Sequence, residues 1–147
     1  MSKEDVLKIK RLNPEGKLPS RATLGSAGLD LYACLGGDQD LEIGLSPVLV
    51  PTGIAIELPS GYEVQIRPRS GLSSKGGMAA FGTVDSDYRG ELKVTMYLLD
   101  GDSQYIVKHG DRIAQMVISQ TVNMETMEVQ CLSSTDRGSG GHGSTGT

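Results

Sequence analysis

The sequence predicts an all-β domain, a jelly-roll-like β-barrel with one short helix and a flexible, glycine-rich C-terminal tail. Short segments of alternating apolar and polar residues are separated at short intervals by Pro and Gly. The chain has 20 Gly, one Phe and no Trp, so its core must consist mainly of aliphatic residues, which suits short strands and tight turns. Because the segments leave no room for helical crossovers, antiparallel pairing is expected.

The strands are expected in a regular series along the chain. Leu7–Lys10 alternates and ends at the turn sequence Asn13–Gly16. Further strands are predicted at residues 45–50, 53–58, 62–66, 92–98 and 113–118. The last of these is a dense apolar run, which is typical of a buried strand.

One helix is expected after residue 69. Ser70 suits the N-cap, Lys75 the last turn and Gly76 the C-terminal stop. With Arg69 beside it, the start of this helix has the donors of an anion site. The alternative is an ordinary cap beside a surface arginine.

The stretch from Gly82 to Val94 concentrates ionisable groups before an alternating strand. Asp85, Asp87, Tyr88 and Arg89 lie within five positions. One interpretation is the tip of a hairpin, with its turn at residues 87–90. The other is a functional site, because a plain turn does not need a tyrosine or the earlier Asp85.

Two polar residues interrupt apolar segments. Asp30 lies between Leu29 and Leu31, so it points either into solvent or towards a polar site. Gln115 lies in the apolar run of the last strand. A buried amide must be hydrogen-bonded, so it satisfies backbone groups or reaches a ligand.

Charge and composition exclude several classes of function. A formal net charge of −4 disfavours binding to nucleic acid or to an anionic membrane. No segment is apolar over the length of a membrane span, and we expect a soluble, intracellular protein, in the cytoplasm or, in a eukaryote, the nucleus.

Cys34 and Cys131 form no Cys-x-x-Cys pair, so a disulfide framework or zinc site is not expected, and Cys34 should be a buried thiol.

The C-terminal tail has no core-forming residue. We expect a β-barrel domain at residues 1–135 and a mobile lid at residues 136–147 that contributes to the active site. Residues 138–143 match Gly-x-Gly-x-x-Gly, but no strand-to-helix unit surrounds them, which excludes a dinucleotide-binding loop. The composition suits a segment that folds over a phosphorylated ligand.

Five motifs that occur in a fixed order identify a protein family more specifically than any of the residues discussed above. The motifs are Ala27–Ala33, Arg67–Leu72, Gly82–Glu91, Gly110–Gln115 and Arg137–Gly146. Together they resemble the trimeric dUTPase family, the dUTP nucleotidohydrolases. The resemblance implies hydrolysis of dUTP to dUMP and pyrophosphate, which limits uracil incorporation into DNA and supplies dUMP for thymidylate synthesis.

The resemblance also implies roles for individual residues. Asp85 would be the general base that orients water for in-line attack on the α-phosphorus, and Tyr88 would exclude a 2′-hydroxyl. Backbone groups of the hairpin leading to Gly82 would read the uracil edge and exclude the methyl group of thymine. Asp30 would support the substrate-bound Mg²⁺ through water. Substrate contacts are implied for Arg69, Ser70, Gly71, Gly82, Val84, Asp85, Tyr88, Gln115, Arg137, His142, Gly143 and Ser144, with Arg137 acting as an arginine finger.

A homotrimer with shared active sites is a further implication of the resemblance. His142 departs from the family, which usually has Phe there to stack on uracil. An imidazole is smaller and titrates near neutrality. Two alternatives stay open: an enzyme similar to dCTP deaminase, and a non-catalytic nucleotide-binding module.

Overall fold

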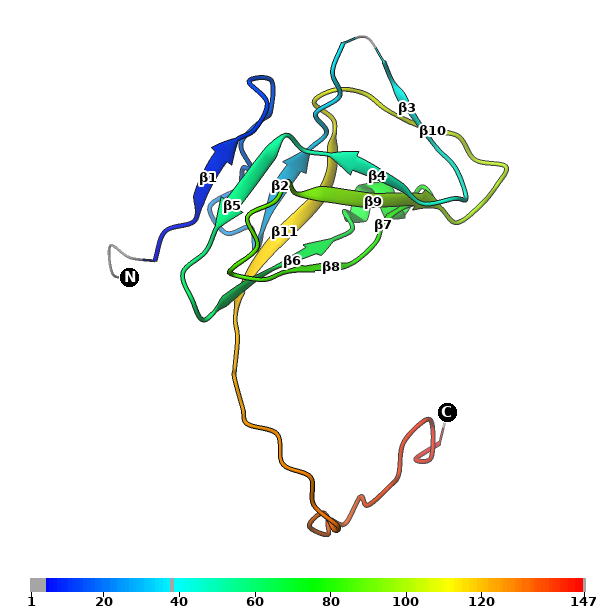
Figure 1. Cartoon of the computed structure of the whole chain (residues 1–147). Helices are drawn as coiled ribbons and strands as arrows, with labels where there is room; N and C mark the ends of the chain where they lie inside the picture. The colour runs from blue at the N-terminus through cyan, green and yellow to red at the C-terminus, as the bar shows by residue number, and fades with distance from the viewer. Residues whose placement is uncertain (1–4, 38, 147) are drawn as a thin grey trace.

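The computed structural model describes residues 5–37 and 39–146, and in these ranges the regular secondary structure is almost entirely β-strand (Figure 1). The predicted all-β class is therefore confirmed. The strands are β1 (Lys8–Arg11), β2 (Gly28–Tyr32), β3 (Leu41–Ile43), β4 (Val48–Pro51), β5 (Ile54–Glu57), β6 (Tyr62–Arg67), β7 (Gly77–Ala79), β8 (Gly82–Val84), β9 (Lys93–Leu98), β10 (Tyr105–Val107) and β11 (Arg112–Gln120), with the helix α1 (Ser70–Ser73) after β6.

Two larger sheets and two strand pairs make up the body of the molecule. The four-stranded sheet has the order β2-β11-β6-β8 and the three-stranded sheet the order β4-β9-β7. β1 pairs with β5, and β10 pairs with β3. All of these pairings are antiparallel, as the short spacing of the segments predicted. The nine-residue β11 lies between β2 and β6 and holds the larger sheet together (Figure 1).

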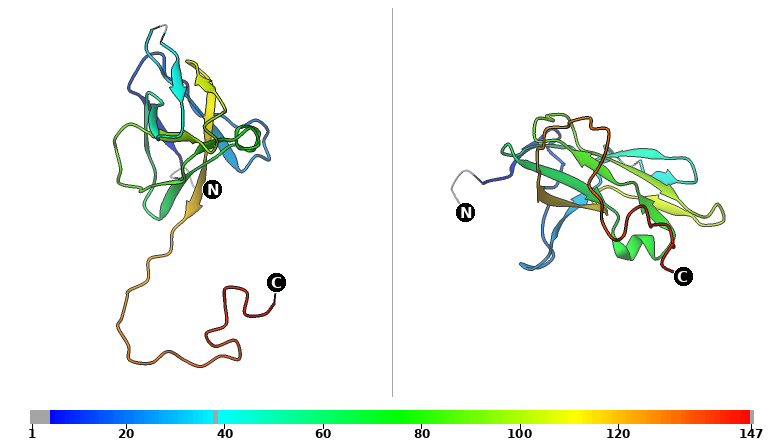
Figure 2. Two further views of the ribbon diagram at one scale, coloured as in Figure 1. Left: turned by 90° about the vertical axis from the view of Figure 1, so that its right-hand side faces the viewer. Right: turned by 90° about the horizontal axis from the view of Figure 1, so that it is seen from below.

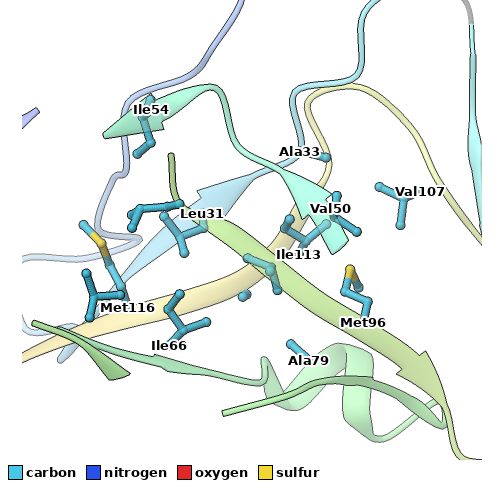
Figure 3. Close-up of a cluster of buried hydrophobic side chains, with 14 of the residues drawn as sticks. Leu31, Ala33, Val50, Ile54, Ile66, Ala79, Met96, Val107, Ile113 and Met116 are labelled. Atoms are coloured by element: carbon cyan, nitrogen blue, oxygen red, sulfur yellow. The ribbon is translucent and has the colours of Figure 1, made fainter. Parts of the chain in front are cut away.

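The core lies between the two larger sheets (Figure 3). Leu31, Ile113 and Met116 come from the four-stranded sheet, and Val50 and Met96 come from the three-stranded sheet; all five are fully buried. Alternation along the strands places these side chains on the core face. In β11 a register shift between Arg112 and Ala114 lets both Ile113 and Met116 point into the core. The dense apolar run predicted near residue 113 is thus a largely buried strand.

The predicted hairpin at Gly82–Val94 is wrong. β8 pairs with β6, with Val84 opposite Val64, whereas β9 pairs with β4 and β7. β7 and β8 are likewise assigned to different sheets, so the segment leading to Gly82 is not a hairpin either. Alternation identifies the buried face of a strand but not its neighbour. Residues 85–92 therefore form a connection that crosses from one sheet to the other.

The predicted helix exists but starts differently. Arg69 is at the N-cap with extended φ and ψ of −92° and 136°, and its side chain makes no capping hydrogen bond. The assignment of Ser70 as N-cap is wrong by one residue, because Ser70 is already helical. Gly76 has a positive φ of 85°, which fits the predicted stop. No helix within the described ranges is long and apolar enough to cross a membrane.

Beyond β11 the chain leaves the body as an extended arm, residues 121–146 (Figures 1 and 2). Every residue from 121 to 139 is exposed. The exposed side chains include five apolar ones: Val122, Met124, Met127, Val129 and Leu132. The expected domain division at residue 135 stays a prediction; the ordered strands end at Gln120, and residues 1–4 and 147 lie outside the described part.

Candidate active site

A polar pocket of about 200 Å³ lies on the outer face of the four-stranded sheet. Gln115 on β11 is directly opposite Asp30 on β2 and Arg67 on β6. Because the neighbours of Asp30 and Gln115 along each strand include core residues, these two side chains project to the opposite face. We call this the arginine pocket; it is lined by Ala22, Ser26, Gly28, Asp30, Arg69, Ser70, Gly71, Arg112 and Gln115.

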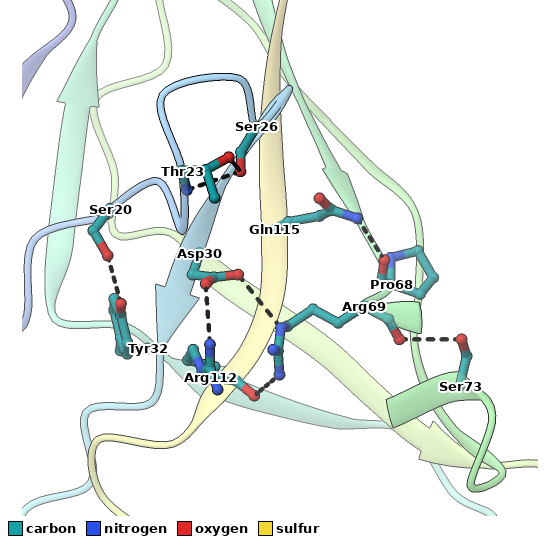
Figure 4. A network of polar contacts seen from close by, with 10 residues as sticks. All are labelled: Ser20, Thr23, Ser26, Asp30, Tyr32, Pro68, Arg69, Ser73, Arg112 and Gln115. Atoms are coloured by element: carbon teal, nitrogen blue, oxygen red, sulfur yellow. Dashed lines mark hydrogen bonds and ion pairs between the residues drawn. The ribbon is translucent and has the colours of Figure 1, made fainter. Parts of the chain in front are cut away.

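Asp30 is at the centre of the arginine pocket (Figure 4). Its Oδ1 lies 3.4 Å from Arg69 Nε and its Oδ2 lies 3.7 Å from Arg112 Nη1. Arg69 also donates to the carbonyl of Arg112 at 3.3 Å. The Asp30 side chain is only 16% exposed, so it faces a polar site and not open solvent. Two guanidinium groups share one carboxylate, which leaves net positive charge available to an anion.

Gln115 closes one side of the same pocket. Its Nε2 donates to the carbonyl of Pro68 at 3.0 Å, which connects β11 to the segment that carries Arg69 (Figure 4). Its Oε1 lies against Gly28, where an added Cβ would collide with it. The amide therefore satisfies a backbone group while it also lines a pocket, so both sequence-based alternatives describe part of its environment.

A second cavity, of about 300 Å³, lies beside the connection between β8 and β9. We call it the Tyr88 cavity. Its walls combine buried apolar residues with two carboxylates and a lysine. It is lined by Leu49, Ile66, Gly82, Thr83, Val84, Asp85, Tyr88, Glu91, Leu92 and Lys93. An apolar wall with a few polar groups is typical of a small-molecule site.

Tyr88 is held in place by its own connection. Its hydroxyl donates to the carbonyl of Glu91 at 3.0 Å, and its ring lies so close to Gly90 that a Cβ there would collide with the hydroxyl. The glycine is thus required by the tyrosine. Glu91 contributes a buried Oε2 that makes no hydrogen bond within the described chain.

The arginine pocket and the Tyr88 cavity are separate spaces with walls of different character. The Tyr88 cavity is lined by Ile66, Val84 and Leu92, which belong to the core. The arginine pocket is lined by outward-facing Asp30 and Gln115. No residue lines both spaces in the described part of the chain.

The predicted site residues fall into three groups. Asp30, Arg69, Ser70, Gly71 and Gln115 meet in the arginine pocket. Gly82, Val84, Asp85 and Tyr88 meet in the Tyr88 cavity. Arg137, His142, Gly143 and Ser144 lie on the arm and line neither space.

Arg112 is the main residue that sequence reasoning missed. It pairs with Asp30 and lines the arginine pocket. It lies inside the motif Gly110–Gln115, but its place opposite Tyr32, next to the position of Asp30, depends on the pairing of β11 with β2.

The donor set of the arginine pocket fits a hydrated Mg²⁺ that arrives with a polyphosphate. The described residues contain no cluster of three His, Cys, Asp or Glu side chains that could hold a metal on its own. Asp30 is the carboxylate in the pocket, and both of its oxygens already pair with arginines. Mg²⁺ keeps several waters and is commonly held by one or two carboxylates and substrate phosphates. Asp30 would hold such an ion through water.

A family model described as dUTPase matches residues 14–146. The chain belongs to the dUTPase family. It is 50% identical over 143 residues to the deoxyuridine 5′-triphosphate nucleotidohydrolase of a Hydrogenobaculum species, covering 95% of this chain and 97% of that one. It is 46% identical over 144 residues to the enzyme of the same name from Finegoldia magna, covering 95% and 99%.

Solved structures of family members establish the jelly-roll fold. A mutant dUTPase of Staphylococcus bacteriophage 80alpha with dUpNHpp superposes with a TM-score of 0.82 at 23% identity, over 97% of this chain and 99% of that one. The dUTPase from phage phi11 of S. aureus gives a TM-score of 0.75 at 23% identity, over 88% and 99%. These identities are low, so this likeness speaks for the fold alone.

Proposed function

We propose that the protein hydrolyses dUTP to dUMP and pyrophosphate in the cytoplasm. The observation that carries this proposal is the grouping of Asp85 and Tyr88 at one cavity in a chain of the dUTPase family. Relatives about half identical to it are named for the same reaction. Such an activity limits uracil incorporation into DNA and supplies dUMP for thymidylate synthesis.

Asp85 acts as the general base in this proposal. It is exposed at the edge of the Tyr88 cavity, so a water can reach its carboxylate. It orients that water for in-line attack on the α-phosphorus and accepts its proton, which is typically worth about 10²–10⁴ in rate. The Tyr88 ring lies against the deoxyribose and leaves no space for a 2′-hydroxyl. Backbone groups at Gly82 and Val84 contact the nucleoside.

The arginine pocket binds the phosphates. Arg69, Ser70, Gly71 and Gln115 contact phosphate oxygens, and Arg112 adds a second guanidinium beside them. An incoming triphosphate competes with Asp30 for the arginines, which frees the carboxylate for the waters of Mg²⁺. Mg²⁺, when bound, offsets the negative charge of the triphosphate and orients it.

We further propose that the working unit is a homotrimer with shared sites. Within the described part of one chain, the proposed nucleoside-binding and phosphate-binding surfaces share no lining residue, which supports a site completed by a second copy. The arm carries five exposed apolar side chains that an assembly would cover. In this arrangement Arg137, His142, Gly143 and Ser144 close over substrate held by a neighbouring copy.

A product assay tests the function. The protein is incubated with dUTP, dCTP or UTP in the presence of Mg²⁺, while pyrophosphate and ammonia are both followed. We expect pyrophosphate from dUTP alone. Ammonia from dCTP would instead indicate a deaminase, and dUTP binding without pyrophosphate would indicate a binding module.

Asp85→Asn tests the general base, and Asp87→Asn is its matched control. Asp87 is two residues away and exposed but does not line the Tyr88 cavity. We expect Asp85→Asn to bind dUTP with a rate lowered by about 10² or more, and Asp87→Asn to stay near the wild-type rate. Equal rates in both variants would refute the assignment of Asp85.

A further inference from the structure

The connection from Asp85 to Leu92 carries Asp85 and Tyr88 but has little backbone structure of its own. A hydrogen bond from Tyr88 N to Asp85 O at 3.1 Å closes a turn within it, and a bond from Leu92 N to Ile54 O at 2.9 Å fixes its far end to β5. It pairs with no strand over this length. The shape of the residues between therefore depends on side chains.

Arg89 supplies side-chain bonds within this connection. Its Nη1 donates to the carbonyl of Ser86 at 2.6 Å and to the carbonyl of Tyr88 at 3.2 Å. One guanidinium thus links the residue that follows Asp85 to Tyr88 itself. The planar, multiply donating guanidinium can do this, whereas a lysine ammonium is a single, compact donor centre.

Glu57 anchors Arg89 to the body. Its Oε1 lies 3.5 Å from Arg89 Nη2, while its Oε2 lies 2.9 Å from Lys8 Nζ on the neighbouring strand β1. Glu57 ends β5, whose preceding residues Ile54 and Ile56 are buried in the core. The connection runs beside β5 in Figure 1, as this contact requires. The guanidinium therefore joins the connection to a rigid strand.

We propose that Arg89, together with Glu57, is a positioning residue pair that holds Asp85 and Tyr88 towards the same cavity, an inference that rests on the proposed dUTP hydrolysis. Neither side chain lines the Tyr88 cavity, so both act through the connection. The Arg89 and Glu57 side chains are 51% and 44% exposed, and an exposed ion pair contributes little to stability. The consequence of losing it is misplacement of the connection, with the fold retained.

Steady-state kinetics of Arg89→Gln, Arg89→Lys and Glu57→Gln test the inference. Lys10→Gln is the control, since it removes one exposed cation from the same strand pair, whereas the β1 cation that pairs with Glu57 is Lys8. A misplacement near 1 Å can cost about 10²-fold in rate. We expect Arg89→Gln to lower kcat about 10- to 100-fold, with a smaller rise in KM, and to increase the kcat/KM of UTP relative to dUTP.

The pattern among the variants separates positioning from other roles. Arg89→Lys should not restore kcat, and the double variant Glu57→Gln/Arg89→Gln should be no slower than Arg89→Gln alone, because both changes remove the same link. A raised KM at unchanged kcat would show that Arg89 binds phosphate directly and would overturn the inference. A change of oligomeric state would overturn it too, as would additive effects of the two substitutions.

Amide hydrogen exchange keeps this test independent of the proposed reaction. Residues 86–91 should exchange faster in Arg89→Gln than in the wild type, while β9 exchanges equally in both. If the wild type does not hydrolyse dUTP but exchange is still faster in Arg89→Gln, the proposed function fails. The structural role of Arg89 in holding the connection is then retained. Unchanged exchange at residues 86–91 refutes the link, whatever the activity.

Discussion

The body, residues 7–120, and the arm, residues 121–146, differ in almost every physical respect. The body buries a continuous aliphatic core between two sheets, whereas every residue of the arm up to residue 139 is exposed. Yet both regions carry family motifs. The comparison teaches that the body builds both pockets without the arm, because no described residue of the arm lines either of them. In the proposed function, the side chains of the arm act only when the arm meets another surface.

Removal of the lid should produce the largest effect. A chain that ends at Thr135 lacks Arg137, and arginine fingers in phosphoryl transfer contribute about 10³–10⁵ in kcat. We expect a kcat loss in that range while the Tm of the body stays unchanged. Activity and thermal unfolding of the full and shortened chains measure this. A large fall in Tm would mean that residues 136–146 support the fold.

Matched methionine substitutions come next. Met96 is fully buried between the sheets, whereas Met127 on the arm is 83% exposed. Met96→Ala should lower the free energy of unfolding by about 2–5 kcal/mol, and Met127→Ala by less than about 0.5 kcal/mol. Urea unfolding at several protein concentrations measures both. A concentration-dependent loss in Met127→Ala would show that a neighbouring copy covers the arm.

The two cysteines differ in exposure in the same way as the body and the arm. Burial raises the pKa of the Cys34 thiol, with smaller contributions from Glu15 and Glu91, while Cys131 lies exposed on the arm. A protonated, buried thiol is a poor nucleophile. We expect a thiol reagent to modify one cysteine per chain in the native protein and two after denaturation, with mass spectrometry identifying Cys131 as the first. Protection of both cysteines in the native protein would show that a neighbouring copy covers Cys131.

Mild acid should give the smallest effect, confined to the body. The hydrogen bond and charge of Lys8, and then the charge of Arg89, hold the pKa of Glu57 below its ordinary value of 4.5. A lowered folded-state pKa means that the contribution to stability is complete above about 4.5 and is lost as pH falls through the lower folded value. The decline of stability in this window should be slightly shallower in Glu57→Gln. Equal declines in the wild type and Glu57→Gln would show that the ion pairs of Glu57 do not contribute to stability in acid.

Much of the site could be predicted because its residues lie in short, local motifs. Asp30 and Gln115 stand out as polar residues in apolar segments, and Arg69 stands out beside a predicted helix start. The structure brings all three together in the arginine pocket. Arg112 and Glu57 could not be found in this way. Arg112 meets Asp30 only through the register of β11 on β2, and Glu57 meets Arg89 from a strand more than thirty positions away.

The sequence by itself determined the longer strand segments, the aliphatic core, the Gly-rich end and the resemblance of the chain to the dUTPase family, but not the three-residue strands β3, β7, β8 and β10. Alternation and turn residues act over a few positions, so they can be read locally. Only the tertiary structure decided that residues 82–94 cross between sheets instead of forming a hairpin, and that the site residues divide between two separate pockets. Strand partners are chosen by packing across the whole core, which no local pattern of residues specifies.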